Sequence, residues 1–343
     1  MFLHNLRSLT HTAFSFEKTG MRPITLMIIL LLMMQPFGRS AMVFAQDPVF
    51  SQFYAAPVYL NPGFAGSTGC SRIALNYRQL RSIENLHTIN FSFDKYVEAL
   101  QGGVGLMITS DHPNMYMMRH TISGIYSYHL MVTGDHFVHF AVQAGYVRND
   151  SRWDRFVFED SGEPPPDNNY KHGLDLAAGV LFFSQKFYGG ISAHHLNEPN
   201  MSLFNDAQSI LPVKYTAHAG LYFERSQTGF GADRGRSYYF SPNIVFQHQG
   251  THSHISGGIY AGAIPLMLGV WYRHWIETPA AVNNTIVFLL GINMGEYRIG
   301  YSYDYSLSGF SDVMHATHEL SLAFRFNCPQ RNIGGRIINY PRF

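Results

Sequence analysis

Histidine is the residue type that most readily suggests chemistry here, because its imidazole binds metals and moves protons near neutral pH. The chain has 18 histidines, and the densest groups are His112, His194-His195 and His252-Ser253-His254. None of these shows the His-x-Glu or His-x-x-x-His spacing, with a carboxylate, that a zinc site requires. The sequence therefore predicts no metal site and no metal cofactor.

Ser253 lies between two histidines and resembles a nucleophile beside its base. On a strand, however, neighbouring residues point to opposite faces, so this spacing does not bring the side chains together. A Gly-x-Ser-x-Gly sequence does not occur either. We predict no catalytic residue, no organic cofactor and no enzymatic activity.

The composition is that of a membrane-embedded sheet. Hydrophobic residues make up 46% of the chain, aromatic residues 15% and charged residues only 14%, against roughly 25% charged residues in soluble domains. The mean hydropathy of -0.07 is too low for a bundle of membrane helices, but it suits strands with one face in lipid and one in water. A net charge of +1 gives no indication of a nucleic-acid partner.

The one long apolar run, Ile24–Met34, follows basic residues and precedes a small-residue site that ends at Ala45. Its 11 residues suit the core of a signal peptide, whereas a membrane helix needs about 20. We predict a signal peptide over residues 1–45 that is cleaved after Ala45, with a membrane anchor as the competing interpretation. Because residues 1–20 are unusual ahead of a signal peptide, Met21 is an alternative start.

Alternation with a period of two recurs along the rest of the chain and predicts strands with unlike faces. In 297–305, the odd positions are apolar or aromatic, and the even positions are Arg, Gly, Ser and Asp. A soluble sandwich also alternates, but charged residues at mid-strand positions would be costly in its packed core and are tolerated in a wet lumen. Tyrosines near strand ends suit the interfacial girdle of a barrel. The sequence thus predicts an all-β fold, a transmembrane antiparallel β-barrel.

We count fourteen strands, an even number as in single-chain bacterial barrels. They span residues 70–78, 86–94, 102–109, 118–131, 136–148, 173–183, 186–194, 214–223, 236–248, 252–261, 264–274, 284–293, 296–304 and 316–327. With the first strand rising from the periplasm, the odd connections are extracellular and mostly long, whereas the even ones are mostly tight. Residues 224–235 and 249–251 break this pattern. The barrel is expected over 70–327, followed by a periplasmic C-terminal tail over 328–343.

The two cysteines, Cys70 and Cys328, open the first strand and follow the last. In a closed antiparallel barrel these strands are neighbours about 4.8 Å apart, and both cysteines fall at the periplasmic rim. That separation suits a disulfide, which persists in an oxidising compartment. We predict this bond; two independent free thiols are the alternative.

Residues 46–69 precede the first strand and contain Pro48, Pro57 and Pro62, which exclude a central strand and a regular helix. A disordered leader is the simplest interpretation. Six large apolar residues argue against it, because a solvated linker carries few of them: Phe50, Phe53, Tyr54, Tyr59, Leu60 and Phe64. We expect this segment to dock, either inside the lumen or across the periplasmic mouth.

This region also carries a family resemblance. Three stretches resemble the N-terminal signature of the PorP/SprF family of type IX secretion membrane proteins: Asp47-Pro48-Val49-Phe50-Ser51-Gln52-Phe53-Tyr54, Tyr59-Leu60-Asn61-Pro62-Gly63-Phe64-Ala65-Gly66 and Asn76-Tyr77-Arg78. Later stretches, including 300–304 and 318–321, are also similar, so the resemblance covers nearly the whole mature chain. Gln79-Leu80 departs from the expected polar, Trp-containing stretch, which bears on the first loop only.

The resemblance implies an outer-membrane protein of a Gram-negative bacterium that helps particular large adhesins or gliding proteins leave through the type IX machinery. Its partners would be the C-terminal domain of the secreted protein, other secretion components and outer-membrane lipid. A passive or ligand-gated uptake channel is the alternative function. Fold alone does not separate the two.

Seven charged residues are expected to face the lumen on the first two and last two strands, which meet where the barrel closes. One interpretation is solvated pore lining; the other is an ion-pair network that braces the closure or holds residues 46–69. These residues are Arg72, Arg78, Asp94, Arg298, Asp304, Glu319 and Arg325.

Overall fold

The structure is a computed structural model that describes residues 46–80, 86–114, 116–134, 136–152, 169–203, 208–226, 237–276, 284–307 and 316–328. The predicted signal peptide, the choice between Met1 and Met21 as the start, and residues 329–343 of the predicted tail lie outside the described residues.

The described residues form one sheet in which each strand pairs antiparallel with its neighbours. The strands are β1 (Ser71–Leu80), β2 (Leu86–Val97), β3 (Gly102–His112), β4 (Met117–Thr133), β5 (His136–Ser151), β6 (Tyr170–Phe183), β7 (Phe187–His194), β8 (Lys214–Leu221), β9 (Phe223–Ser226), β10 (Ser237–Gln249), β11 (His252–Ala263), β12 (Leu266–Trp275), β13 (Thr285–Met294), β14 (Tyr297–Ser306) and β15 (Thr317–Phe326).

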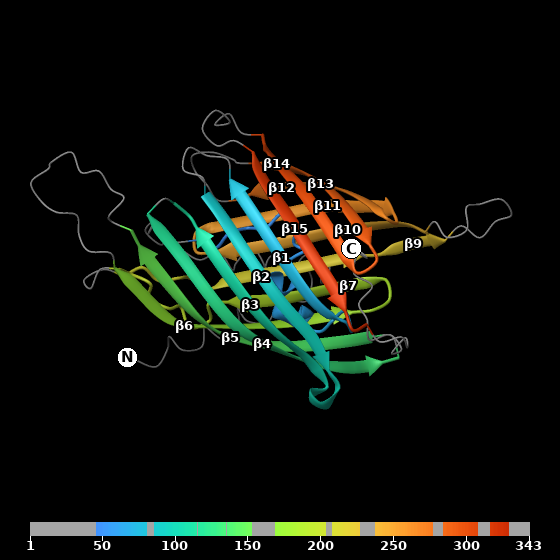
Figure 1. The fold of residues 1–343 in the computed structure, drawn as a ribbon, viewed down its shortest axis with the longest axis horizontal. Coiled ribbons are helices and arrows are strands. Elements are labelled where there is room, and N and C mark those ends of the chain that lie inside the picture. Colours follow the sequence, from blue (N-terminus) through green and yellow to red (C-terminus); the bar gives the residue numbers. More distant parts are fainter. Residues whose placement is uncertain are drawn as a thin grey trace, which may run out of the picture. The chain divides into compact units, whose positions relative to one another are not determined.

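The sheet closes on itself because β1 pairs with β15 along its whole length, from Ser71 opposite Phe326 to Leu80 opposite Thr317. Figure 1 shows β1, in blue, beside β15, in orange-red. β8 and β9 both pair with β10 and are separated only by Tyr222, so they are two parts of one strand. The predicted antiparallel barrel of fourteen strands is confirmed.

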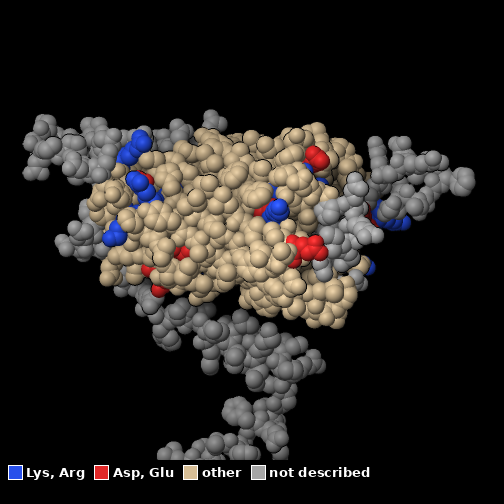
Figure 2. Space-filling view, turned by 60° about the horizontal axis from the view of Figure 1, so that its bottom comes forward, with Lys and Arg blue, Asp and Glu red and all other residues tan. Residues whose placement is uncertain are grey.

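The two faces of the strands differ as the alternation predicts. On β14, Tyr297, Ile299 and Tyr301 are exposed on the outside, whereas Ser302 and Asp304 are buried on the inside. Charged side chains are few on the face drawn in Figure 2, and most of that surface is uncharged. An uncharged, largely apolar exterior is what a lipid environment requires of a barrel. Among the described residues, no helix is long and apolar enough to cross a membrane.

The two ends of the barrel differ in their connections. At the end where β1 begins, here called the turn end, the connections include Gly295-Glu296 and Ile264-Pro265. At the opposite end, here called the loop end, residues 195–213 connect β7 to β8. Only Gly250-Thr251 joins β10 to β11 at the loop end, which agrees with the short connection expected there. Assignment of the turn end to the periplasm stays a prediction.

Inside the ring of strands lies the segment of residues 46–69. It contains a single helical turn, α2 (Pro57–Leu60), and a 3-10 turn, η1 (Pro62–Phe64). The prolines were expected to exclude a central strand and a regular helix, and the segment has only these short turns; Pro57 occupies the first position of α2, where its missing N–H costs nothing.

The lumen is less polar than the alternation suggests. Apolar side chains of the segment pack with inward-facing residues of the strands in one buried cluster: Phe53, Tyr54, Ala55, Leu60, Phe64, Phe137, Leu181, Phe183, Tyr188, Tyr222, Tyr239, Val245, Tyr260, Met267, Trp271, Val287 and Leu289. Of the two places expected for the segment, the structure has the one inside the lumen, where its apolar side chains fill this part of the barrel.

Candidate functional site

The site with the most developed chemistry is the contact between residues 46–69 and the inner wall of the barrel. We call residues 46–56 the front half and residues 57–69 the root half. The front half has no helix or strand, whereas the root half contains α2 and η1. The root half leads directly into Cys70 and β1 at the turn end.

Asp47 anchors the front half at the loop end. Its carboxylate lies 2.8 Å from His195 Nε2 and 3.5 Å from both Arg119 Nη1 and Lys214 Nζ. Arg119 lies near the start of β4, Lys214 begins β8 and His195 follows β7, so three elements converge on one carboxylate. Its backbone N–H donates to Gln249 Oε1 at 3.0 Å.

His195 is held between two carboxylates. Its Nδ1 lies 2.8 Å from Asp175 Oδ1, while its Nε2 faces Asp47. Burial alone would lower the pKa of His195, but Asp47 and Asp175 outweigh burial and raise the pKa to about 9. With both ring nitrogens protonated, the imidazolium donates to both carboxylates.

The pKa of Asp47 is consistent with a contact between an imidazolium and a carboxylate. Burial would raise the pKa of Asp47, but His195, Lys214 and Arg119 together hold it well below its ordinary value. Asp47 is therefore ionised at neutral pH, and the contact is a charged one. Charge-assisted hydrogen bonds are stronger than neutral ones.

Glu319 on β15 binds the middle of the front half through the backbone. Its two carboxylate oxygens accept from the consecutive N–H groups of Ser51, at 2.8 Å, and Gln52, at 3.1 Å. The Gln52 amide donates to the Glu319 carbonyl at 2.8 Å and accepts from Ser321 Oγ at 2.6 Å. Gln52 is completely buried, so these bonds satisfy groups that would otherwise be costly.

The Ser51 hydroxyl lies in a second charged group. It donates to Asp304 Oδ2 at 2.5 Å and accepts from Arg273 Nη2 at 3.0 Å. Arg273 Nη1 and Arg78 Nη2 lie 3.5 and 3.8 Å from the same Asp304 oxygen. Ion pairs among β1, β12 and β14 thus close around one small side chain of the segment.

An aromatic pocket receives Phe53. Its ring centroid lies 4.6 Å from that of Trp271 in an edge-on arrangement and 6.0 Å from that of Tyr260. Tyr54 packs edge-on against the same Tyr260 at 5.2 Å. Such edge-to-face contacts add roughly 0.5–1.5 kcal/mol beyond the burial of area.

Pro48, Phe50 and Tyr59 tie the two halves together. Tyr59 donates from its hydroxyl to the Pro48 carbonyl at 2.8 Å, and its ring lies 4.9 Å from that of Phe50. The Lys214 ammonium sits 4.5 Å from the centroid of the Tyr59 ring. Part of the family motif therefore folds back on itself.

Asn61 fixes the root half to β6 and β7. Its Nδ2 donates to the Val180 and Ile191 carbonyls, both at 3.1 Å, and its Oδ1 accepts from Gly63 N at 2.8 Å. The Leu60 carbonyl accepts from Ser192 Oγ at 2.8 Å. Pro62 opens η1 directly after Asn61, so the Leu-Asn-Pro sequence forms a turn bound to the wall.

Ala65 and Gly66 close the root half against β2 and β3. Gly66 N donates to Asp94 Oδ2 at 2.8 Å, and Arg72 Nε donates to Asp94 Oδ1 at 2.8 Å. A Cβ on Gly103 would lie only 2.0 Å from the Ala65 carbonyl oxygen. Glycine at this strand position lets the two backbones touch.

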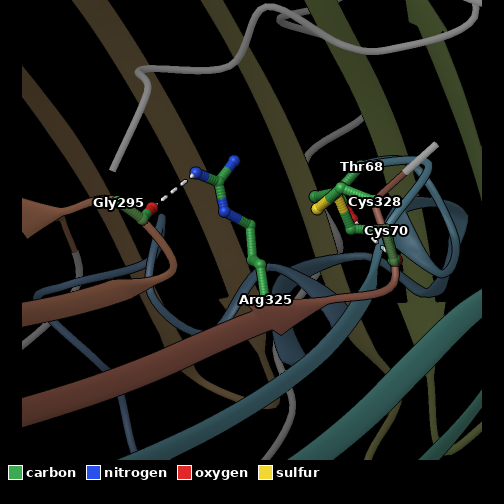
Figure 3. The surroundings of a disulfide bond; sticks show 5 residues. All are labelled: Thr68, Cys70, Gly295, Arg325 and Cys328. Atoms are coloured by element: carbon green, nitrogen blue, oxygen red, sulfur yellow. Dashed lines mark hydrogen bonds between the residues drawn. A yellow bond between two sulfur atoms is a disulfide. The ribbon is translucent and has the colours of Figure 1, made fainter. Parts of the chain in front are cut away.

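The predicted lumen charges are thus not one cluster. Arg72 and Asp94 bind the root half, whereas Arg78, Asp304 and Glu319 surround the front half. Arg298 and Arg325 contact neither half of the segment through the contacts described above. Arg325 donates to the Gly295 carbonyl at 3.3 Å (Figure 3), and Arg298 lies opposite Asn293 and Ala323.

Cys70 and Cys328 form a disulfide at the turn end, with their Cα atoms 4.3 Å apart. Figure 3 shows the bond beside Thr68, whose hydroxyl donates to the Cys70 carbonyl at 3.1 Å. The bond links the root of the lumenal segment to the end of β15. It spans 258 positions of sequence and fastens the barrel where it closes.

Sequence reasoning gave no role to Arg119, Lys214 and Arg273, and it considered His195 only as a metal ligand, which it rejected. Two of them, Arg119 and Arg273, stand at inward positions of alternating strands, which was a usable signal. His195 follows β7 in the left-handed region, with φ of 59°, which no sequence pattern indicated. Among the described residues, no group of three or more potential ligands could hold a metal ion.

The sequence profile described as Type IX secretion system membrane protein PorP/SprF matches residues 42–324. The chain belongs to the PorP/SprF family. This confirms the resemblance stated on residues 47–66, and the lumenal contacts show that the motif residues of this PorP/SprF protein are mostly those that hold the segment in place. A comparison with curated protein sequences gives no match.

Among solved structures, the PorP/SprF chain is similar to CdiB from Acinetobacter baumannii, with 7% identity and a TM-score of 0.41 over 75% of this chain and 60% of CdiB. It is also similar to the outer membrane protein Omp33 of Acinetobacter baumannii, with 11% identity and a TM-score of 0.40 over 76% of this chain and all of Omp33. The chain thus spans about 60% of the length of CdiB.

Proposed function

We propose that this protein is an accessory component of the type IX secretion system in the outer membrane. In this role it assists the export or surface attachment of specific large secreted proteins, of adhesin or gliding type, through their C-terminal domain. The observation that carries the proposal is the family match over residues 42–324. The closed barrel with a largely uncharged exterior supports an outer-membrane location.

The filled lumen weighs against the alternative of a passive uptake channel. Cavities that adjoin the front half hold about 20, 20 and 40 Å³, the space of one or a few water molecules. A sugar-sized solute could pass this level of the lumen only if the segment moved. An accessory role needs no such passage.

A comparison of secreted proteins from a gene-deletion strain and its parent tests the proposal. We expect one or a few large proteins to remain inside the deletion strain while other type IX substrates are still released, and the native gene to restore their export. An unchanged set of secreted proteins, together with lost uptake of a nutrient, would replace the proposal with the channel function.

A further inference from the structure

We propose that the inner wall around the front half is a receptor site for an extended peptide that bears a carboxylate, and that residues 46–56 are its exchangeable occupant. The biological partner would be a segment of an exported protein, so the identity of the partner rests on the proposed function. The binding chemistry itself rests on the contacts of the front half alone.

The first subsite recognises a carboxylate. Arg119, His195 and Lys214 surround the Asp47 side chain, and each of these basic side chains is at most 10% exposed. Asp175 and Asp111 also line the adjoining cavity and offset part of this positive charge. With Asp47 withdrawn, the Arg119, Lys214 and His195 side chains would lose the carboxylate that they share, which leaves a place for one anionic group.

The second subsite binds the peptide backbone and does not select particular side chains. Glu319 binds two consecutive N–H groups, which any residue except proline supplies. The neighbouring subsites are selective, because Asp304 and Arg273 bind a hydroxyl and Trp271 and Tyr260 bind an aromatic ring. The preferred ligand therefore has a carboxylate, then a small hydroxyl residue four positions later and an aromatic residue two positions after that.

The front half can leave while the root half stays. Its backbone N–H groups at Asp47, Ser51 and Gln52 are bound by side chains of the barrel and not by a strand ladder. The root half is held separately by Asn61, by the close approach of Ala65 to Gly103, and by the disulfide at Cys70. Exchange at the front half thus breaks the contacts of Tyr59 with Pro48 and Phe50 but requires no change in the barrel.

Small cavities border the front half. The three small cavities all adjoin the front half, one at Gln46 and Val49, one at Phe50 and Phe53, and one at Asp47. The charged groups of the wall would be hydrated in an emptied lumen, whereas Trp271 and Tyr260 would lose their apolar contacts. A replacement ligand with its own aromatic side chain restores those contacts.

Binding of a synthetic peptide to the full mature chain in detergent micelles tests the site. The probe has the sequence of residues 46–56 with a fluorophore at its C-terminus, and a second probe carries Asn in place of the Asp. The protein is used as the native chain, as Asp47→Asn to weaken the resident segment, and as Asp150→Asn as a matched control. Asp150 pairs with Arg148 on the outside of the barrel.

We expect the Asp probe to bind the Asp47→Asn chain at least tenfold more tightly than the native or Asp150→Asn chain. The Asn probe should bind the Asp47→Asn chain at least tenfold more weakly than the Asp probe does. Ser51→Ala, which loosens the same half through a different contact, should also increase binding and serves if Asp47→Asn does not fold. Equal binding to native and loosened chains, or equal binding of both probes, would overturn the site.

The two proposals can fail separately. Peptide binding with an unchanged set of secreted proteins would remove the export function and leave the receptor site in place. An export defect without peptide binding would remove the receptor site and leave the export function in place.

Discussion

The close approach of the Ala65 and Gly66 backbone to Gly103 gives a sharp test of the docked arrangement. In Gly103→Ala, the added Cβ would lie 2.0 Å from the Ala65 carbonyl oxygen and 2.7 Å from Gly66 N. Both neighbours are backbone atoms, so no side chain can rotate away to relieve the overlap. The matched control is Gly124→Ala on β4, where an added Cβ meets nothing within 4 Å.

Overpacking of this kind typically costs about 1–3 kcal/mol. If that free energy falls on docking of the root half, the undocked population rises about five- to 150-fold, because about 1.4 kcal/mol corresponds to a factor of ten. Chymotrypsin cleaves after aromatic residues and leucine, and Tyr59, Leu60 and Phe64 are buried or nearly so in the docked state. Cleavage follows the open population when opening is fast relative to proteolysis.

We therefore expect Gly103→Ala to be cleaved in residues 57–66 at least fivefold faster than the native chain, as measured by mass spectrometry of the released fragments. Gly124→Ala should be cleaved at the native rate. Electrophoretic mobility of unboiled samples reports whether each barrel is folded. A Gly103→Ala chain that is folded and as well protected as the control would refute the docked arrangement of Ala65 and Gly66.

Three further predictions follow from named contacts. Thiol labelling of the denatured, non-reduced chain should find no free cysteine, and two labelled cysteines per chain would contradict the disulfide. Cys70→Ser should lower the free energy of unfolding by about 5 kcal/mol in the chain-entropy account. The Asp47–His195 contact should hold the front half best between about pH 4 and 6.5. The contribution of His195 is lost as pH rises through about 9, and that of Asp47 is lost as pH falls through its lowered pKa. The chymotrypsin cleavage rate of Asp47→Asn divided by that of the native chain should therefore fall between pH 6.5 and 9.5, and a constant ratio would argue against the charged contact. Glu319→Ala leaves the N–H groups of Ser51 and Gln52 without their acceptor and should destabilise front-half docking by about 1–3 kcal/mol. Hydrogen exchange at those two amides should become faster, and unchanged exchange would show that Glu319 does not bind them.

The strands could be predicted because the two faces of a barrel meet different solvents. Alternation in 297–305 was clear because lipid selects Tyr and Ile on one side, while the inside retains Arg, Ser and Asp. The strand expected over 264–274 is present as Leu266–Trp275, but its two faces differ little in polarity over residues 266–271: Met267 and Trp271 point inward, and Leu266, Leu268 and Val270 point outward. Both faces are apolar there because the inner face packs against the segment.

Tertiary pairing in the lumen was beyond sequence reasoning. Asp47 meets Arg119, His195 and Lys214 across separations of 72, 148 and 167 positions, and no periodicity encodes which inward residues a threaded segment will touch. The same limit explains why seven lumen charges were predicted as one cluster. Their strands are neighbours, but charges at the two ends of those strands bind different halves of the segment.

Conductance of the purified native chain in a planar lipid bilayer tests most directly whether the lumen is filled by the protein's own N-terminal segment. The contacts of residues 47–66 with the wall predict an ion-tight barrel with no steady conductance, and brief openings that become more frequent in Asp47→Asn. A steady conductance of porin size from the native chain, unaffected by Asp47→Asn, would contradict the filled lumen and favour the channel function.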